Sequence, residues 1–92
     1  MTIIDAAMLE RIPANSVTKV AFYKRDEITT DLICCQVVCG DEVWTFHEEC
    51  VGWSLLLAHL GALPEFRADW FARISQPPFG RSEFVAFSRL LT

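Results

Sequence analysis

Residues 28–47 read ITTDLICCQVVCGDEVWTFH, and this stretch decides the fold. β-Branched and small apolar residues fill positions 28–39, as in a buried strand, and residues 42–47 alternate between apolar and polar side chains. Gly40-Asp41 between them is typical of a two-residue hairpin loop, because glycine adopts the positive φ that such a turn requires. This loop sets the predicted register, in which the opposed pairs are Val37 with Trp44, Cys35 with Phe46, Val38 with Val43, and Cys34 with His47.

A further strand precedes this hairpin. Residues 17–23 alternate, and we expect residues 24–27 to form the turn after them, so that Phe22 faces Thr29 and Val20 faces Asp31. One sheet face then becomes a core face with Val20, Phe22, Ile33, Cys35, Val37, Trp44 and Phe46. The opposite face carries Val17, Ala21, Tyr23, Ile28, Leu32, Cys34, Val38, Val43 and His47, with Lys19, Thr30, Gln36 and Thr45 between them. A solvated sheet face is normally more polar than this second set.

The flanking segments are predicted to add helices and a last strand. Residues 3–12 form a short helix with Ile4, Met8, Leu9 and Ile12 on one side. Trp53, Leu56, Leu57 and Leu60 have the spacing of an amphipathic helix, which Gly61 is expected to end in a left-handed conformation. A second helix begins at Pro64 and turns Phe66, Trp70, Phe71 and Ile74 inward, and residues 83–89 alternate as a strand at the sheet edge.

The order β-β-β-α-α-β predicts an α+β fold, with a small antiparallel sheet and two helices packed on one of its faces. A small half-open barrel closed by a helix is the alternative. The length of 92 residues predicts a single domain spanning residues 1–92.

Composition narrows the partners and the compartment. The net charge is −4 and the eight Lys and Arg residues are scattered, whereas phosphate binding needs clustered positive charge, so nucleic acid is not an expected partner. The longest apolar run, residues 55–58, is far too short to span a membrane, and residues 1–5 do not resemble a secretory signal. We therefore expect a cytoplasmic protein without membrane contact.

The four cysteines, Cys34, Cys35, Cys39 and Cys50, fall in predicted strands or next to a helix, which favours reduced thiols over a disulfide framework. A zinc site would combine Cys35, Cys39, His47, Cys50 and His59. The chain has no Cys-x-x-Cys pair, and Cys35 and Cys39 on one strand lie ~13 Å apart. The pattern favours core thiols, and we expect no metal and no cofactor.

A thiol-dependent site is the alternative function. The predicted register makes Cys34 and His47 cross-strand neighbours, so the imidazole is placed to act as a base toward the thiol. Asp31 or Glu49 would have to orient the ring, which makes the alternative site Asp31, Cys34, His47 and Glu49. Catalytic thiols normally sit at helix N-termini or in clefts, and a mid-strand thiol is more typical of packing. Asp31 is expected to have a structural role and not to act as a general base.

Several motifs resemble a group of short uncharacterised bacterial proteins. The motifs are FYKRDE at 22–27, TDLIC at 30–34, HEE at 47–49, the helix at Trp53, LPEF at 63–66 and PPF at 77–79. The resemblance extends from about Val17 to Phe87 and lies in the order of the motifs. It implies a bacterial, intracellular, single-domain protein, and it implies no activity and no catalytic residue.

The second apolar sheet face indicates what the domain does. Soluble monomers rarely expose an apolar patch beyond a few hundred Å², and pairing across a two-fold axis is the commonest way to cover one. We therefore expect a non-enzymatic interaction domain that forms a homodimer, or binds another protein, through that face. The predicted interface residues are Val17, Ala21, Leu32, Cys34, Val38 and Val43.

Overall fold

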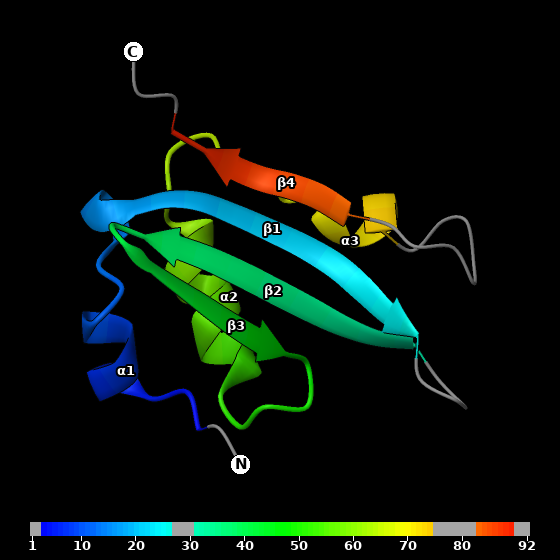
Figure 1. Cartoon of the computed structure of the whole chain (residues 1–92), viewed down its shortest axis with the longest axis horizontal. Coiled ribbons are helices and arrows are strands. Elements are labelled where there is room, and N and C mark those ends of the chain that lie inside the picture. Colours follow the sequence, from blue (N-terminus) through cyan, green and yellow to red (C-terminus); the bar gives the residue numbers. More distant parts are fainter. Residues whose placement is uncertain (1–2, 27–30, 75–82, 90–92) are drawn as a thin grey trace.

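The computed structural model describes residues 3–26, 31–74 and 83–89, with the backbone alone for residues 26 and 31. Four strands form one antiparallel sheet in the order β3-β2-β1-β4. They are β1 (Val17–Asp26), β2 (Asp31–Cys39), β3 (Glu42–His47) and β4 (Glu83–Ser88). The helices α2 (Trp53–Gly61) and α3 (Trp70–Ile74) lie on one face, and α1 (Ala6–Glu10) with a 3₁₀ turn (Ala14–Ser16) leads into β1 (Figure 1). The predicted α+β fold is confirmed.

The β2–β3 hairpin has the predicted register. Val37 pairs with Trp44, Cys35 with Phe46, Val38 with Val43 and Cys34 with His47. Gly40 has φ 61°, the left-handed value expected of the first loop residue. The core cluster on the helical side includes Cys35, Val37 and Phe46 together with Leu56 and Leu60 of α2.

The predicted β1–β2 register is wrong. Strand β1 continues through Lys24 to Asp26, so Val20 pairs with Val37 and Phe22 with Cys35 instead of Asp31 and Thr29. This register sets apolar residues opposite one another, and the Lys24 side chain is buried on the same face. The shift is an even number of residues, and every side chain therefore keeps its predicted face. The predicted partner Thr29 lies outside the described residues, as do Ile28 and Thr30.

Val17 is an exception, because a bulge precedes the regular part of β1. Val17 pairs with Cys39, but Lys19 pairs with Val38, so two steps along β1 match one step along β2. The side chain of Val17 consequently belongs to the core cluster and is fully buried. The prediction that Val17 lies on the helix-free face is therefore wrong.

The N-terminal helix is shorter than predicted. Asp5 caps α1 by accepting a 2.9 Å bond from the Met8 backbone N–H, and the chain before it is extended, with Ile4 N donating to the carbonyl of Val51 at 2.7 Å. Ile4 and Ile12 flank the helix and are both buried in the core. His59 of α2 lies 2.8 Å from the carbonyl of Ile12 and ties α2 to this segment.

The predicted end of α2 and the predicted start of α3 are both wrong. Gly61 is the last residue of α2, and the capping residue Ala62 has φ −80°, so no left-handed glycine ends the helix. Helix α3 begins at Trp70 instead of Pro64, because the Arg67 N–H bonds the Ala86 carbonyl at 2.8 Å and ties the preceding segment to β4. Phe71 consequently points outward, with 56% of its surface exposed. None of the helices formed by the described residues is long and apolar enough to cross a membrane.

Strand β4 joins the sheet beside β1, as expected of an edge strand. Val20 pairs with Phe87 and Ala21 with Val85, which leaves Ala86 as the extra residue of a second bulge. The bulge is the reason that Phe84, Ala86 and Phe87 all contact the core cluster although they do not alternate strictly. The outward carbonyl of Ala86 is the one that Arg67 binds.

We predict that Gly52→Ala strongly destabilises the fold. Gly52 has φ 91°, and a Cβ there would overlap the backbone carbonyl of Ile4. Strain and overpacking together are expected to lower the free energy of unfolding by at least ~2 kcal/mol in urea titrations. Gly61→Ala is the control, because no atom lies within 4 Å of its added Cβ and alanine favours a helix by up to ~1 kcal/mol. Equal stability of the two variants would contradict the close approach of the Ile4 carbonyl to Gly52.

Candidate functional site

The face of the sheet opposite α2 and α3 is the candidate site, because no helix of the described chain covers it (Figure 1). Its side chains form cross-strand rows. Lys19 of β1 stands beside Val38 and Val43, and Ala21 stands beside Gln36 and Thr45. The next two rows are Glu83, Tyr23, Cys34 and His47, and then Arg25 with Leu32.

Burial divides the predicted interface residues. Ala21, Leu32 and Cys34 lie on this face but are buried within the single chain, whereas Val38 is half-buried. Val43 is 58% exposed. The exposed apolar part of the face is therefore narrower than the sequence predicts and is divided between its two edges, with Val38 and Val43 at the β3 edge and the unpredicted Val85 on β4 at the other.

The predicted neighbours Cys34 and His47 do lie opposite each other. The Cys34 thiol, at 2% exposure, is 3.8 Å from the carbonyl of Leu32 and is also hydrogen-bonded to Tyr23. Burial first, and then the neighbouring Cys34, raise the pKa of the Tyr23 hydroxyl. A buried thiol with these contacts is a packing group, because an attacking thiolate needs access and stabilisation of its charge.

The other two members of the alternative site do not complete it. Glu49 contacts His47 through its backbone, where the N–H donates to Nδ1 at 3.2 Å, and its exposed carboxylate plays no part in that bond. Asp31 begins β2 and pairs with Asp26 at the end of the ladder, three positions before Cys34. The structure therefore brings Cys34 and His47 together and leaves Asp31 apart from them.

The predicted zinc ligands point to different places. Cys35 lies in the core, the Cys39 thiol is 4.0 Å from the carbonyl of Arg11, and His59 is bound to the carbonyl of Ile12. Within residues 3–26, 31–74 and 83–89, no three His, Cys, Asp or Glu side chains are arranged to hold a metal ion. All four cysteines are free thiols.

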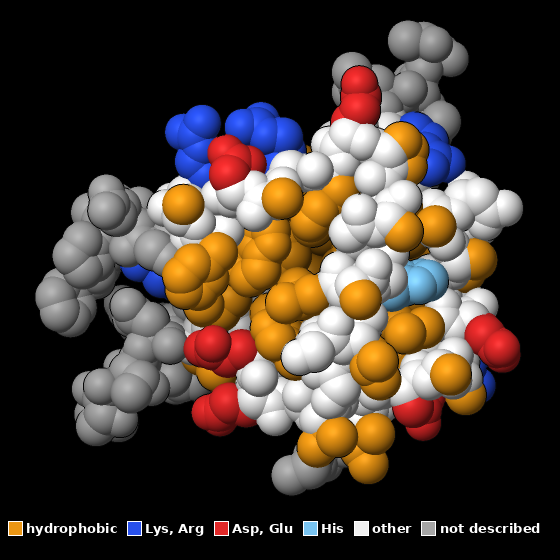
Figure 2. Space-filling view, turned by 180° about the vertical axis from the view of Figure 1, so that it is seen from behind, with side chains coloured by type: hydrophobic (Ala, Val, Ile, Leu, Met, Phe, Trp, Pro, Cys, Tyr) orange, Lys and Arg blue, Asp and Glu red, His pale blue; other side chains and the backbone are white. Residues whose placement is uncertain are grey.

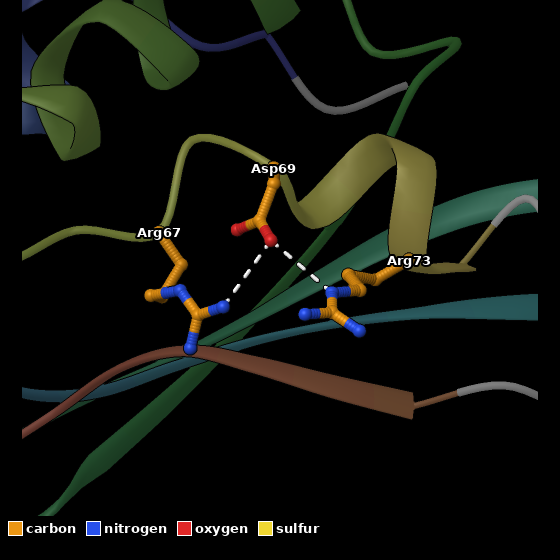
Figure 3. A network of polar contacts seen from close by, with 3 residues as sticks. All are labelled: Arg67, Asp69 and Arg73. Carbon is orange, nitrogen blue, oxygen red and sulfur yellow. Dashed lines mark hydrogen bonds and ion pairs between the residues drawn. The ribbon is translucent and has the colours of Figure 1, made fainter.

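Two features of the helical side were not predicted as a site. Phe22 stacks on Trp70 and meets Trp53 and Phe66 edge-on, and these outer rings are only half-buried. Beside them, Asp69 accepts bonds from Arg67 at 3.2 Å and Arg73 at 3.1 Å (Figure 3). The helical spacing of the aromatic residues favoured packing over a ligand site. The i,i+4 spacing of Asp69 and Arg73 on the expected helix is the signal that could have indicated their contact.

Comparisons add no assignment to this geometry. No protein-family model, no characterised protein and no solved structure gives a significant match to the chain. The resemblance to short bacterial proteins stays a prediction, and the function has to be argued from the surfaces themselves.

We predict that the thiols react in a fixed order. Cys34, Cys35 and Cys50 are buried and Cys39 is partly exposed, so one thiol per chain should react with a disulfide reagent in the folded protein and the rest only after denaturation. Cys39→Ser should abolish the fast reaction, whereas Cys34→Ser should preserve it. Rapid labelling of Cys34 in the folded protein would instead support the thiol-dependent alternative.

We also predict that stability falls in alkali. Burial, followed by the charge of Cys34, raises the pKa of Cys35 far above its ordinary value, so the folded state keeps a proton that the unfolded state releases above about pH 8.5. Stability is unaffected below that pH and falls above it, by up to ~1.4 kcal/mol per pH unit for this thiol. Cys35→Ala should flatten the slope measured by urea unfolding between pH 8 and 10. Val37→Ala, an equally buried neighbour, should lower stability without changing the slope.

Proposed function

We propose that this chain is a non-enzymatic interaction domain that self-associates, with two copies packing their helix-free sheet faces together. The observation that carries the proposal is the one-sided sheet, which has helices on only one face in the described chain (Figure 1). The other face carries small apolar, aromatic and charged residues. Two such sheets pack ~10 Å apart when their faces interdigitate. Free thiols fit a reducing compartment, and we place the domain in the cytoplasm.

The charges of the face suit a two-fold arrangement. On β1, Lys19 and Tyr23 lie on either side of the Ala21 row. Tyr23 pairs with Glu83 of β4. An axis running across the strands at Ala21 places the Lys19 row of one copy over the Tyr23 row of the other. Each lysine then lies over Tyr23 of the opposite copy, one strand spacing (~4.8 Å) from Glu83, and the exposed Val43 and Val85 are covered.

The size of the face sets the expected strength. Four strands ~4.8 Å apart and about six residues long, at ~3.3 Å per residue, span a face of ~19 by 20 Å, or ~400 Å² on each copy. Stable interfaces bury about 800 Å² on each partner, so this dimer belongs to the small, readily dissociating class. We expect a dissociation constant in the micromolar range.

Sedimentation and light scattering over a micromolar concentration series test the proposal. The wild type should change from monomer to dimer, and Val43→Glu should stay monomeric because it places an uncompensated charge in the interface. Val51→Glu is the matched control, since Val51 is 53% exposed against 58% for Val43 but lies off this face, paired with Ile3. A wild type that stays monomeric at all concentrations refutes self-association. Equal dissociation by both variants refutes the assigned face.

A further inference from the structure

His47 lies on the proposed dimer face at the end of β3. It belongs to the row that Glu83, Tyr23 and Cys34 form, and its side chain is half-buried. Histidine is the side chain whose charge ordinarily changes between pH 5 and 8. The chain has two histidines, and the second, His59, is on α2 at the helical side. His47 is therefore the one placed to make the dimer face sensitive to pH.

The turn after β3 holds the imidazole of His47 as a neutral ring. The Glu49 backbone N–H donates to Nδ1 at 3.2 Å, and since a backbone N–H can only donate, Nδ1 carries the lone pair and Nε2 the proton. The same turn is closed by the Cys50 N–H, which donates to the His47 carbonyl at 2.9 Å. A second proton enters the ring at Nδ1 and replaces the bond from Glu49 with two N–H groups that face each other.

The titratable and charged groups around His47 belong to its own chain. Cys34 faces it from β2, and Tyr23 lies beyond Cys34 on β1. In the turn, the Glu48 carboxylate accepts a backbone N–H of β2 at 3.1 Å, and Glu49 is exposed. These groups are present in the monomer and in the dimer, so the change on association comes from the opposite copy.

The two-fold arrangement proposed above sets His47 against an apolar side chain of that copy. The axis follows the Ala21 row, so it turns each strand over its own counterpart and exchanges the two rows beside the axis. On β3 those rows hold Val43 and His47, with Thr45 between them. Each His47 therefore meets Val43 of the opposite copy, and Val43 is open to this contact because it is 58% exposed in the single chain.

We propose that protonation of His47 dissociates the dimer, a regulation that rests on the self-association proposed above. A charged imidazole covered by valine loses water and gains no partner of opposite charge, and burial of an unpaired charge is unfavourable. Two such contacts form in each dimer. The monomer consequently binds protons that the dimer excludes, so the dimer is strongest when both imidazoles are neutral and weakens as the pH falls.

Sedimentation of the wild type at pH 7.5 and pH 6.0 tests the inference. We expect the dissociation constant to be about tenfold larger at pH 6.0, because protonated imidazoles must lose their protons before two copies associate. His47→Gln should give the same constant at both pH values, since glutamine does not titrate. His59→Gln is the matched control, because it replaces the histidine that bonds the Ile12 carbonyl, and it should keep the pH dependence of the wild type.

NMR of the two imidazole rings is a second measurement, and it does not require His47→Gln to fold. In the wild type, one of the two Cε1–H signals should titrate at lower pH when the protein concentration is raised above the dissociation constant. His59→Gln identifies which signal belongs to His47. Titration of the His47 signal at the same pH in monomer and dimer would overturn the inference.

The outcomes separate this inference from self-association and from the other side of the molecule. Hydrophobic side chains also gather on the helical side (Figure 2), and two copies joined there would leave the surroundings of His47 unchanged. Equal dissociation constants of the wild type at the two pH values would therefore overturn the role of His47 and leave self-association standing. A pH dependence that His47→Gln keeps and His59→Gln loses would overturn it as well, and would assign the contact to the side of α2. A wild type that stays monomeric at pH 7.5 refutes self-association and its regulation together.

Discussion

The ring of Phe22 stacks on Trp70 and meets Trp53 and Phe66 edge-on, while its backbone pairs with Cys35 on one side and Phe84 on the other. One residue of the central strand thus contacts or pairs with five segments of the chain. Helix α3 is only five residues long and would not persist alone in water, because so short a helix cannot recover the cost of nucleation. Its position depends on this stacking and on the tie between Arg67 and β4.

The two faces of the sheet bury the apolar side chains of this hydrophobic chain in different ways. On the helical side, large aromatic rings fill the space under α2 and α3 and continue to the surface. On the helix-free side, Ala21 and Cys34 are buried although none of the described helices covers that face. The surplus of hydrophobic residues is therefore divided between the two sides, and the larger exposed rings are on the helical one.

What the sequence predicts well is local. Gly40-Asp41 and two alternating strands define the β2–β3 register, and with it the meeting of Cys34 and His47. The β1–β2 register was missed because Lys24 to Asp26 are charged and suggest a turn, although they extend a strand and bury the Lys24 side chain. Pro64 is a good helix start by local criteria, but the bond between Arg67 and Ala86, distant in sequence, prevails over it. The stacking of Phe22 on Trp70 likewise joins residues distant in sequence, so the sequence spacing did not indicate it, whereas the contacts of Asp69 with Arg67 and Arg73 are local.

The place of β4 has a consequence for how the protein is made. Val20 pairs with Val37 on one side and with Phe87 on the other, so the central strand receives its second neighbour from the far end of the chain. While the intervening residues are being synthesised, β1, which includes Phe22, is an open edge strand that can pair with other nascent chains. The β1–β2–β3 meander can form early because its contacts are local, and docking of β4 then becomes the slow step that removes the hazard. Once β4 has docked, it forms the new outer edge of the sheet. The bulge at Ala86 and the hydrogen bond from the Arg67 N–H to the Ala86 carbonyl then leave part of that edge unavailable for pairing with another chain.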